Sequence, residues 1–484
     1  MPRAATIGRR ATKDTAVGYS RADNTTMSGI DVVLISTYEL GRQPFGLASP
    51  AAWLAGIGAS VTCLDLAIEQ LDERRVAAAD LVAFYVPMHT ATRLAAATIE
   101  RVKRVNPTAH LCFYGLYAPL NAEYLRRLGA DTILGGEFEE GLVALATRLM
   151  AGERTTQGPL ILLAKQRFVV PDRAGLPALQ KYARLILATG EQRVVGYTEA
   201  TRGCKHMCRH CPIPPVYEGT FRVVQPEVVL ADVERQVAAG ARHITFGDPD
   251  FFNGPGHALR VVEALHRRFP DLTYDVTIKV EHLLTHARHL PTLRETGCLF
   301  VTSAVESIDP SILAIFDKRH TRDEFVRVVE LSRALGLTLN PTFVTFTPWT
   351  TLEGYRDLLE TVVALDLVDN VAPIQYGIRL LIPAGSKLLD VPLVQEFIEE
   401  YDEAALYWRW THPDPRVDAL QVAVLAAVQE GQARGESRRA IFSTVWTLAH
   451  AAGSPASGRP LRLPEPSLAP VRAPIPYLSE PWYC

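Results

Sequence analysis

Short apolar runs alternating with amphipathic helical patterns constrain the fold of this chain more than any other feature. The stretches between the first runs, such as Ala91–Val105 and Asn121–Leu128, have apolar residues at helical spacing. Continuous apolar strands separated by helices predict a parallel, doubly wound sheet, whose ligands lie beyond the carboxyl ends of the strands. The expected strands of this sheet are Asp31–Ser36, Ser60–Leu66, Leu81–Val86, His110–Tyr114 and Asp131–Leu134.

A second α/β series begins at Val194. Helical patterns such as Val228–Ala239, Arg322–Leu335 and Leu352–Leu365 separate its apolar runs. Six β/α units predict a partial (β/α)6 barrel with its active site at the carboxyl ends of the strands. The expected strands are Val194–Ala200, His243–Phe246, Leu272–Val280, Leu299–Val305, Leu337–Phe346 and Ile374–Ile382.

The whole chain is therefore expected to be an α/β protein with two units and flanking segments. Residues 1–27 are aperiodic and form either a disordered leader or a stretch upstream of the true start at Met27. Residues 28–152 form the first domain, 153–193 a linker, 194–390 the barrel and 391–453 a helical region. Residues 454–484 form a proline-rich tail, which we expect to be extended.

Charge and cysteine content exclude several classes of protein. The 484 residues carry 50 Lys+Arg against 53 Asp+Glu, a net charge of −3, without a long basic run. This argues against partners such as nucleic acid or a membrane surface. No stretch has the length and apolarity of a membrane span. Seven cysteines are too few for a disulfide framework in a chain of this length, which favours a reduced, cytoplasmic protein.

Three of the cysteines form the motif C-x₃-C-x₂-C, just after the first expected strand of the second unit. Cys204, Cys208 and Cys211 could hold three irons of a 4Fe–4S cluster and leave the fourth iron open to a ligand with an amine and a carboxylate. The alternative is a zinc site, for which His206 or His210 could be the fourth ligand.

In this context the motif resembles that of radical S-adenosylmethionine (SAM) enzymes, over about residues 190–390. The resemblance implies that Cys204, Cys208 and Cys211 bind a 4Fe–4S cluster, whose open iron takes the amino and carboxylate groups of SAM. It also implies a reductant such as flavodoxin or ferredoxin. His210 stands where the family usually has another aromatic residue, and it offers a flat ring against the cluster or adenine.

Further candidate residues follow the expected barrel strands. The stretch Phe246–Phe251 stands where the family has a Gly-Gly-Glu-like segment, so Asp248 or Asp250 could accept hydrogen bonds from the SAM amino group. Capping of a helix N-terminus is the alternative role for these aspartates.

Polar residues after later strands complete the set. The resemblance implies that Glu306 and Ser307 contact the ribose and carboxylate of SAM. Lys279 either reaches the same cavity or faces solvent, because it alternates with apolar neighbours. Arg379 lies inside an apolar strand pattern, where it needs a partner, and a ligand carboxylate is one candidate.

The first unit resembles the cobalamin-binding domain of cobalamin-dependent radical SAM enzymes. Pro87–Thr90 and Gly135–Glu137 fall where that class lines its corrinoid cleft. The Asp-x-His-x-x-Gly motif that supplies a lower axial histidine is absent, which excludes the standard histidine-on mode. The alternative is a domain that retains the fold without the cofactor.

The chain ends in Leu-Ser-Glu-Pro-Trp-Tyr-Cys484. This ending resembles the CUAEP/CCAEP-tail radical SAM proteins, cut at the first member of a Cys–Cys or Cys–selenocysteine pair. Some members of this group act in arsinothricin biosynthesis, so the resemblance implies transfer of the 3-amino-3-carboxypropyl group of SAM to trivalent arsenic. Because thiolates are good ligands for soft ions, we expect Cys484 to help capture this small-molecule acceptor. The alternative is a tail with an incidental cysteine.

These observations lead to three hypotheses. The first is an enzyme that cleaves SAM reductively and transfers a SAM-derived group to a small molecule, an arsenical in the specific reading. The second is a cobalamin-dependent methyltransferase of a natural product. The third is a non-enzymatic iron–sulfur or arsenic-responsive binding protein.

Overall fold

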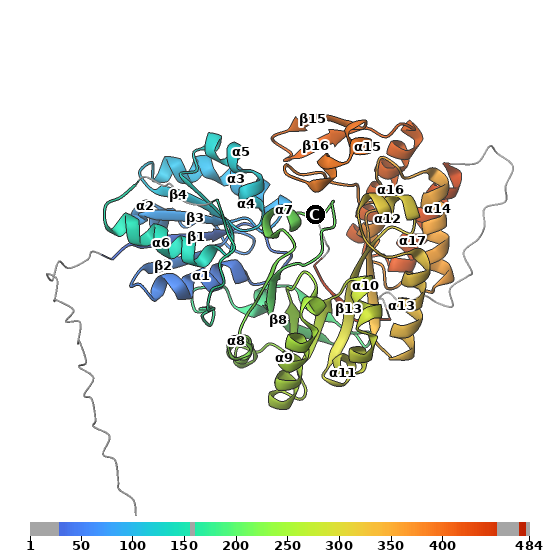
Figure 1. Ribbon diagram of the computed structural model, residues 1–484, viewed down its shortest axis with the longest axis horizontal. Coiled ribbons are helices and arrows are strands. Elements are labelled where there is room, and N and C mark those ends of the chain that lie inside the picture. Colours follow the sequence, from blue (N-terminus) through green and yellow to red (C-terminus); the bar gives the residue numbers. More distant parts are fainter. Residues whose placement is uncertain (1–28, 155–159, 453–473, 481–484) are drawn as a thin grey trace, which may run out of the picture.

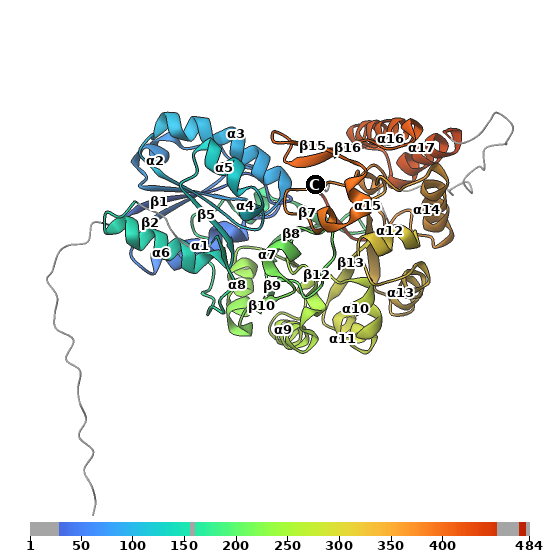
Figure 2. The same ribbon diagram turned by 45° about the horizontal axis from the view of Figure 1, so that its top comes forward.

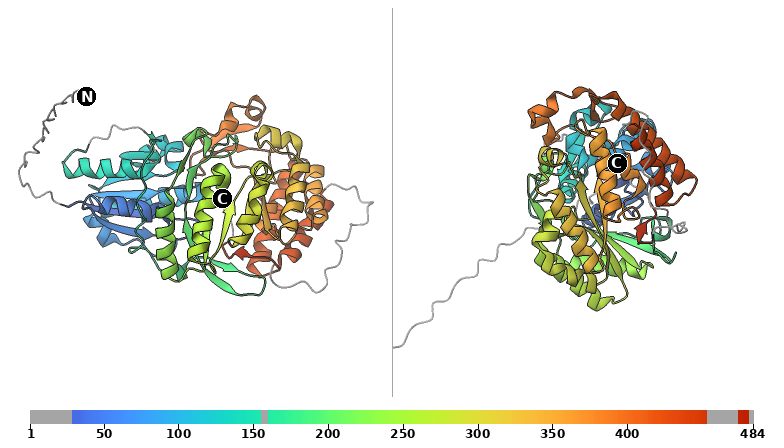
Figure 3. Two further views of the ribbon diagram at one scale, coloured as in Figure 1. Left: turned by 60° about the horizontal axis from the view of Figure 1, so that its bottom comes forward. Right: turned by 90° about the vertical axis from the view of Figure 1, so that its right-hand side faces the viewer.

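The computed structural model describes residues 29–154, 160–452 and 474–480, so the expectations for the leader and for Cys484 lie outside the described residues. The first domain, the barrel and the C-terminal helices follow one another along the long axis of the molecule (Figures 1 and 3). None of the described helices is long and apolar enough to cross a membrane.

The first domain is the doubly wound parallel sheet that the apolar runs predict. Its strand order is β2-β1-β3-β4-β5-β6. Alternate residues of β1 enter two different cores: Val32 and Leu34 pack on the face of α1 and α6, and Val33 and Ile35 pack on the face of α2, α3 and α5. The strands are β1 (Asp31–Ser36), β2 (Ser60–Asp65), β3 (Leu81–Tyr85), β4 (His110–Tyr114), β5 (Thr132–Gly136) and β6 (Ile161–Leu162); the helices are α1 (Phe45–Ala55), α2 (Glu73–Ala78), α3 (His89–Val105), α4 (Tyr117–Leu120), α5 (Ala122–Leu128) and α6 (Phe138–Met150).

The second unit is a curved half-barrel of seven strands, in the order β14-β13-β12-β11-β8-β7-β17. Five of these strands are parallel; β7 pairs antiparallel with the edge strand β8, and β17 pairs antiparallel with β7. The strands are β7 (Arg184–Ile186), β8 (Gln192–Thr198), β11 (His243–Phe246), β12 (Thr273–Thr277), β13 (Cys298–Glu306), β14 (Thr338–Phe343) and β17 (Tyr477–Leu478). The helices that cover them are α8 (Pro226–Ala238), α9 (Pro255–Arg268), α10 (Val280–Thr285), α11 (Leu290–Glu295), α12 (Pro310–Ile315), α13 (Arg322–Ala334) and α14 (Leu352–Ala364).

The predicted sixth barrel strand, Ile374–Ile382, is not formed as a strand. Its first residues belong to the 3₁₀ helix η4 (Pro373–Tyr376), and one isolated bridge joins Arg379 to Phe346. The Gln375 side chain explains the difference, because its Oε1 accepts the Phe343 N–H at 2.9 Å in place of a main-chain carbonyl.

The region predicted to be helical, 391–453, contains a β-hairpin before its two long helices. The short α15 (Pro392–Gln395) is followed by β15 (Ile398–Asp402) and β16 (Tyr407–Trp410), and only then by α16 (Pro415–Ala433) and α17 (Arg438–Ala451). Trp410 anchors the hairpin, since its ring is buried and its Nε1 donates to the carbonyl of Leu380 at 2.9 Å. The hairpin lies between the first domain and the C-terminal helices (Figures 1 and 2).

Candidate active site

The cysteine motif lies on a loop between the short strand β9 (Thr201–Gly203) and the helix α7 (Pro214–Tyr217). Pairing of β9 with β10 (Phe221–Val223) holds the start of the loop. Asn253 adds to this, because its Oδ1 accepts the Lys205 N–H at 3.2 Å and lies 3.7 Å from Cys204 Sγ. The far side is held by the Arg209 N–H, which donates to the carbonyl of Phe316 at 2.9 Å. The loop is thus held beside Cys204 by β10 and Asn253, and between Cys208 and Cys211 by the carbonyl of Phe316.

The three thiols do not converge as the ligands of a single zinc ion would. Among the described residues, only one trio of His, Cys, Asp or Glu side chains brings its ligand atoms within 4.8 Å of one another, and it contains no cysteine. Zn–S bonds of about 2.3 Å require sulfur atoms roughly 4 Å apart. In a 4Fe–4S cluster each thiolate binds a different iron, so wider spacing is expected.

The thiols are nevertheless neighbours in a buried environment. Burial raises the pKa of Cys211 to about 12, and the nearby Cys208 and Cys204 add to the shift. Burial likewise raises the pKa of Cys204 to about 11. Cys204 and Cys208 are buried and Cys211 is partly exposed at the cavity. Three soft donors close to one another are the set that an iron–sulfur cluster uses, since the bound metal supplies the positive charge that thiolates need.

The two aspartates after β11 have different surroundings. Asp248 is buried and accepts hydrogen bonds from the Ala200 N–H at 2.9 Å and the Thr201 hydroxyl at 2.5 Å. Burial raises its pKa to about 7, against the lowering effect of these hydrogen bonds. Asp250 caps the 3₁₀ helix η2 (Phe251–Asn253), as its Oδ1 accepts the Phe252 N–H at 3.0 Å. Asp250 therefore has the capping role that was the alternative to SAM binding.

His210 belongs to a buried ion-pair network. Its Nε2 lies 3.1 Å from Glu306 Oε1, and its ring lies 4.5 Å from that of Phe316. Lys318 Nζ lies 3.4 Å from the same Glu306 oxygen. Burial opposes ionisation of Glu306, but Lys318 and His210 outweigh it and lower its pKa to about 2. Glu306 also has a φ of +68°, a strained conformation for a residue other than glycine.

The other predicted residues divide between the site and its surroundings. Lys279 is buried rather than solvent-facing, and its Nζ lies 3.0 Å from Glu281 Oε2. Ser307 is buried beside Glu306, where its hydroxyl accepts the Asp309 N–H at 3.1 Å.

Arg379 has protein partners that satisfy its guanidinium without a ligand. It donates to Asp418 Oδ1 at 2.5 Å and to the carbonyl of Trp410 at 2.6 Å. Its guanidinium also lies over the Trp410 ring, 3.4 Å from the centroid. These contacts give the candidate role in ligand binding no support.

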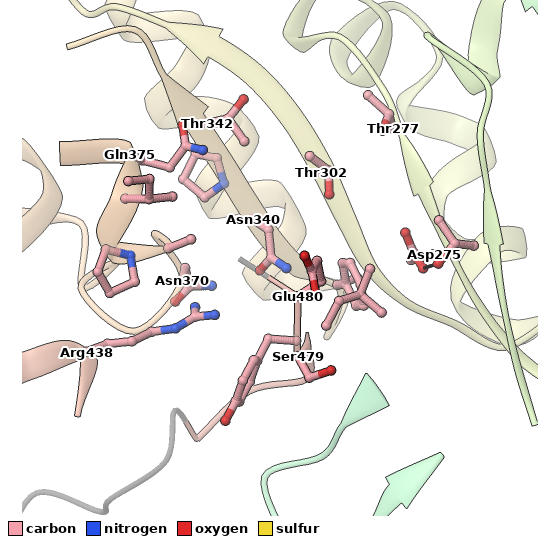
Figure 4. A pocket seen from close by; sticks show the side chains of 18 of the residues that line it. Asp275, Thr277, Thr302, Asn340, Thr342, Asn370, Gln375, Arg438, Ser479 and Glu480 are labelled. Carbon is pink, nitrogen blue, oxygen red and sulfur yellow. Dashed lines mark hydrogen bonds between the residues drawn. The ribbon is translucent and has the colours of Figure 1, made fainter. Parts of the chain in front are cut away.

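A cavity of about 1110 Å³ fills the inside of the half-barrel, and we call it the lumen cavity (Figure 4). Cys211, Gly247 and Asp248 belong to its lining, so it reaches the cluster loop at the carboxyl end of β11. Asp250 and Lys279 do not line it. Its lining combines apolar residues such as Phe246 and Phe300 with polar side chains from four successive strands: Thr245, Asp275, Thr277, Thr302, Asn340 and Thr342. A hydroxyl- and amide-rich wall suits a small polar molecule.

Comparisons with known proteins agree with this geometry. Residues 198–362, which contain the cysteine loop and most of the half-barrel, match the family model of the radical SAM superfamily. The chain contains a radical SAM domain. Such a domain uses a 4Fe–4S cluster and SAM, so the loop and the lumen cavity next to it are the expected cofactor site.

Several curated relatives are methylating enzymes. The chain is 24% identical over 265 residues to the bacteriochlorophyllide d C-8(2)-methyltransferase of Chlorobaculum tepidum, covering 50% of this chain and 58% of the relative. It is 25% identical over 226 residues to the hopanoid C-3 methylase of Methylococcus capsulatus, covering 45% and 43%. The chain thus spans about half the length of the curated relatives it matches.

Solved structures share the two-unit architecture. The methyltransferase TsrM from Kitasatospora setae, solved with cobalamin and a [4Fe-4S] cluster, has a TM-score of 0.56 at 19% identity, over 70% of this chain and 73% of that one. The cobalamin-dependent enzyme OxsB has a TM-score of 0.63 at 13% identity, over 84% and 67%. At this identity the likeness concerns the fold, and it confirms the predicted order of a Rossmann-like domain followed by a radical SAM half-barrel.

A buried ion-pair cluster that the sequence did not reveal joins the first domain to the radical SAM domain. Arg202 of β9 lies 2.7 Å from Glu139 of α6 and 2.6 Å from Glu199, and Glu137 follows at 3.5 Å. Its guanidinium also lies 5.1 Å from the Phe138 ring centroid. The only sequence signal was an excess of acidic residues after a buried strand, which is not specific to a contact between domains.

The carboxyl edge of the first sheet has features that fit a bound polar group. In this strand order the ligand crevice lies at the carboxyl ends of the neighbouring strands β1 and β3, because the helices that follow them lie on opposite faces of the sheet. Ser36 Oγ and Glu39 Oε2, at the end of β1, are buried and have no hydrogen-bond partner among the described residues. Buried polar atoms are normally paired, so these two fit the amide-bearing periphery of a corrinoid. His89 at this edge contacts the carbonyl of Ala405 through Nε2.

The described end of the tail forms one wall of the lumen cavity. Tyr477 and Leu478 of β17 pair with β7, and Ser479 and Glu480 lie against the cavity (Figure 4). The Tyr38 hydroxyl of the first domain donates to Glu480 Oε1 at 3.4 Å. Cys484 lies four positions further along the chain, outside the described residues.

Proposed function

We propose that this chain is a radical SAM enzyme that transfers a SAM-derived group to a small-molecule acceptor, and that the group is a methyl group moved in a cobalamin-dependent reaction. The observation that carries the proposal is the contact between the carboxyl edge of the first sheet, where a corrinoid would bind, and the cysteine loop, where the cluster would bind. Arg202, two residues before Cys204, is bound at 2.7 Å to Glu139, three residues after the end of β5. The ligand edge of the first domain and the cluster loop therefore lie beside each other.

In this proposal the residues of the chain bind and orient the reactants. Cys204, Cys208 and Cys211 would hold a 4Fe–4S cluster, which supplies one electron to the sulfonium of SAM when it is reduced. Asp248, which lines the lumen cavity together with Cys211, would accept a hydrogen bond from the SAM ammonium. The polar wall of the lumen cavity would position the acceptor.

A corrinoid would bind at the carboxyl ends of β1 and β3, with Ser36 and Glu39 as hydrogen-bonding residues. It would supply a carrier for the methyl group between SAM and an unactivated acceptor. The absence of the Asp-x-His-x-x-Gly motif predicts that no protein histidine ligates the cobalt. The printed functions of the curated relatives, a bacteriochlorophyllide methyltransferase and a hopanoid methylase, support methyl transfer without identifying the acceptor.

Transfer of the 3-amino-3-carboxypropyl group to trivalent arsenic is the second candidate. It rests on the resemblance of the tail that ends in Cys484, and on the position of the described tail at the lumen cavity. The methylating relatives make methyl transfer the better supported of the two.

Product analysis separates these functions. Anaerobically reconstituted protein is incubated with SAM, hydroxocobalamin, flavodoxin or dithionite, and candidate acceptors. 5′-Deoxyadenosine together with S-adenosylhomocysteine supports the methyltransferase. Methylthioadenosine supports aminocarboxypropyl transfer. No SAM turnover with a fully reduced cluster would contradict both and favour an iron–sulfur binding protein.

Cobalamin binding is tested separately from turnover. The protein is mixed with hydroxocobalamin, freed of unbound corrinoid and reduced to Co(II) for electron paramagnetic resonance. We expect one bound corrinoid without superhyperfine coupling from a protein nitrogen. Coupling from a histidine nitrogen would show that the motif argument is wrong, and no uptake would remove cobalamin from the proposal.

A further inference from the structure

Three buried side chains that can bind a metal converge behind the cluster loop. His206 belongs to the loop, Asp250 follows β11 and His282 lies in α10. Asp250 Oδ2 is 2.8 Å from His282 Nδ1 and 3.4 Å from His206 Nε2. All three atoms lie within 4.8 Å of one another, and this is the only such trio among the described residues. The exposed fractions of the three residues are 8%, 1% and 4%, so water does not surround them.

The converging atoms are the unsatisfied ones. Asp250 Oδ2, His206 Nε2 and His282 Nδ1 have no hydrogen bond of acceptable geometry in the described part of the chain. The other polar atoms of the same side chains are better placed: Asp250 Oδ1 accepts the Phe252 N–H at 3.0 Å, and His206 Nδ1 lies 3.3 Å from Lys279 Nζ. Buried polar atoms without partners are rare, and three that meet at one point indicate a common ligand.

We propose that His206, Asp250 and His282 bind one divalent ion of the zinc class, separate from the cluster. Two imidazoles and a carboxylate are ligands that Zn²⁺ and Fe²⁺ accept. Bonds of about 2.0–2.2 Å place neighbouring ligand atoms roughly 3–3.5 Å apart, close to the separations in this trio. Metal binding through Nε2 would leave a proton on His206 Nδ1, and Glu281 Oε2, which lies 3.8 Å away, would have to move closer to accept it.

The ion would lie outside the lumen cavity, which indicates a structural role. None of the three residues lines the lumen cavity, so the ion does not meet the acceptor. It joins the middle of the loop, between Cys204 and Cys208, to the ends of β11 and β12. The ion therefore positions the loop that carries the thiols and takes no part in the chemistry.

The alternative is a hydrogen-bonded trio without metal. In that arrangement Lys279 donates to His206 Nδ1, and both histidines donate their protons to Asp250. Metal content distinguishes the two arrangements directly, and it is independent of SAM cleavage and of any acceptor.

The test uses untagged protein with a complete cluster, verified by iron and sulfide analysis, so that no empty cysteine can take up zinc. The holoenzyme is treated with a mild chelator, supplied with zinc sulfate, desalted and analysed by mass spectrometry of the metals. We expect about one zinc per chain beyond the cluster iron. His282→Gln should lose this zinc and keep the cluster. His289→Gln, a matched change at a partly exposed histidine outside the trio, should retain both.

Parent holoenzyme that binds no zinc under these conditions would overturn the proposal, whether or not the His282 variant folds. Zinc retained in full by a folded His282→Gln protein would also overturn it, because the ion would then lie elsewhere. Neither outcome affects the proposed function, which is judged from cluster content and the products of SAM.

Discussion

Replacing Arg202 with Met should destabilise the contact between the two domains more than any surface change of the same kind. Arg202 is 6% exposed in its side chain, and Glu139, its closest partner on the first domain, is fully buried. Burial alone raises the pKa of Glu139, but Arg202 outweighs it and holds that pKa below the ordinary value. Without the guanidinium, a buried carboxylate remains with no cation. Breaking a buried pair in this way costs about 3–5 kcal/mol.

The loss should depend on pH in a direction that the charges determine. In the Met variant the folded-state pKa of Glu139 rises above its unfolded value, so the folded state favours the protonated acid. The contribution of such a group to the free energy of unfolding is fully present below its unfolded-state pKa and is lost as the pH rises through its folded-state pKa. Glu137, whose pKa burial already raises to about 7 against the effect of Arg202, should act in the same direction. The deficit is therefore larger at pH 8 than at pH 6.

Urea unfolding of the reduced, cluster-free protein, followed by circular dichroism at both pH values, measures the effect. Arg101→Met is the control, since Arg101 and Glu73 form a pair of 2.8 Å with both side chains about half exposed. Such pairs are worth about 0–1 kcal/mol. An Arg202→Met protein no less stable than the Arg101→Met protein would refute the reasoning.

Three further predictions follow from other parts of the molecule. Cys208→Ala should lose the 4Fe–4S cluster in iron and sulfide analysis, and a normal cluster in that variant would contradict the ligand assignment. Asp65→Asn should stabilise the protein by about 3 kcal/mol at pH 8 and have little effect at pH 4. The reason is that burial raises the pKa of Asp65 to about 6, so its stabilising contribution is lost as the pH rises from about 4 to 6; unfolding curves at both pH values check it. Cys484→Ser should weaken turnover of an arsenical acceptor while leaving cluster content unchanged, and equal activity of variant and parent would dismiss a role for this thiol.

The first five strands of the first sheet and the five parallel strands of the half-barrel could be predicted because each is a local pattern. Asp31–Ser36, His110–Tyr114 and His243–Phe246 have the predicted bounds, since buried parallel strands are continuous apolar runs. The cysteine motif was equally recognisable, because its three candidate cluster ligands lie within eight residues. Local sequence was sufficient wherever the feature itself was local.

Features built from distant residues were missed. Ile374–Ile382 has the composition of a strand, but the Gln375 side chain replaces the hydrogen bond that a strand would make. Tyr407–Trp410 forms a hairpin because Trp410 bonds to the carbonyl of Leu380, 30 residues away. His282 follows the third predicted barrel strand in the sequence, but its convergence with His206 and Asp250 depends on how the segments after two strands meet the cysteine loop. Neither spacing nor composition carries that information.

Few contacts hold β17, the strand of the tail that forms one wall of the lumen cavity, to the rest of the barrel. β17 has two residues, and the contact of Ser479 with Arg184 joins positions 295 residues apart in the chain. Leu478 is only partly buried on the small cluster formed by Leu185, Val195 and Phe300. Releasing this strand breaks few hydrogen bonds and exposes little apolar surface, so its amides should exchange with solvent at a free energy well below that of global unfolding. Entry and exit of a small molecule can then proceed by local unfolding of one strand, while the buried ion pairs keep the two domains together.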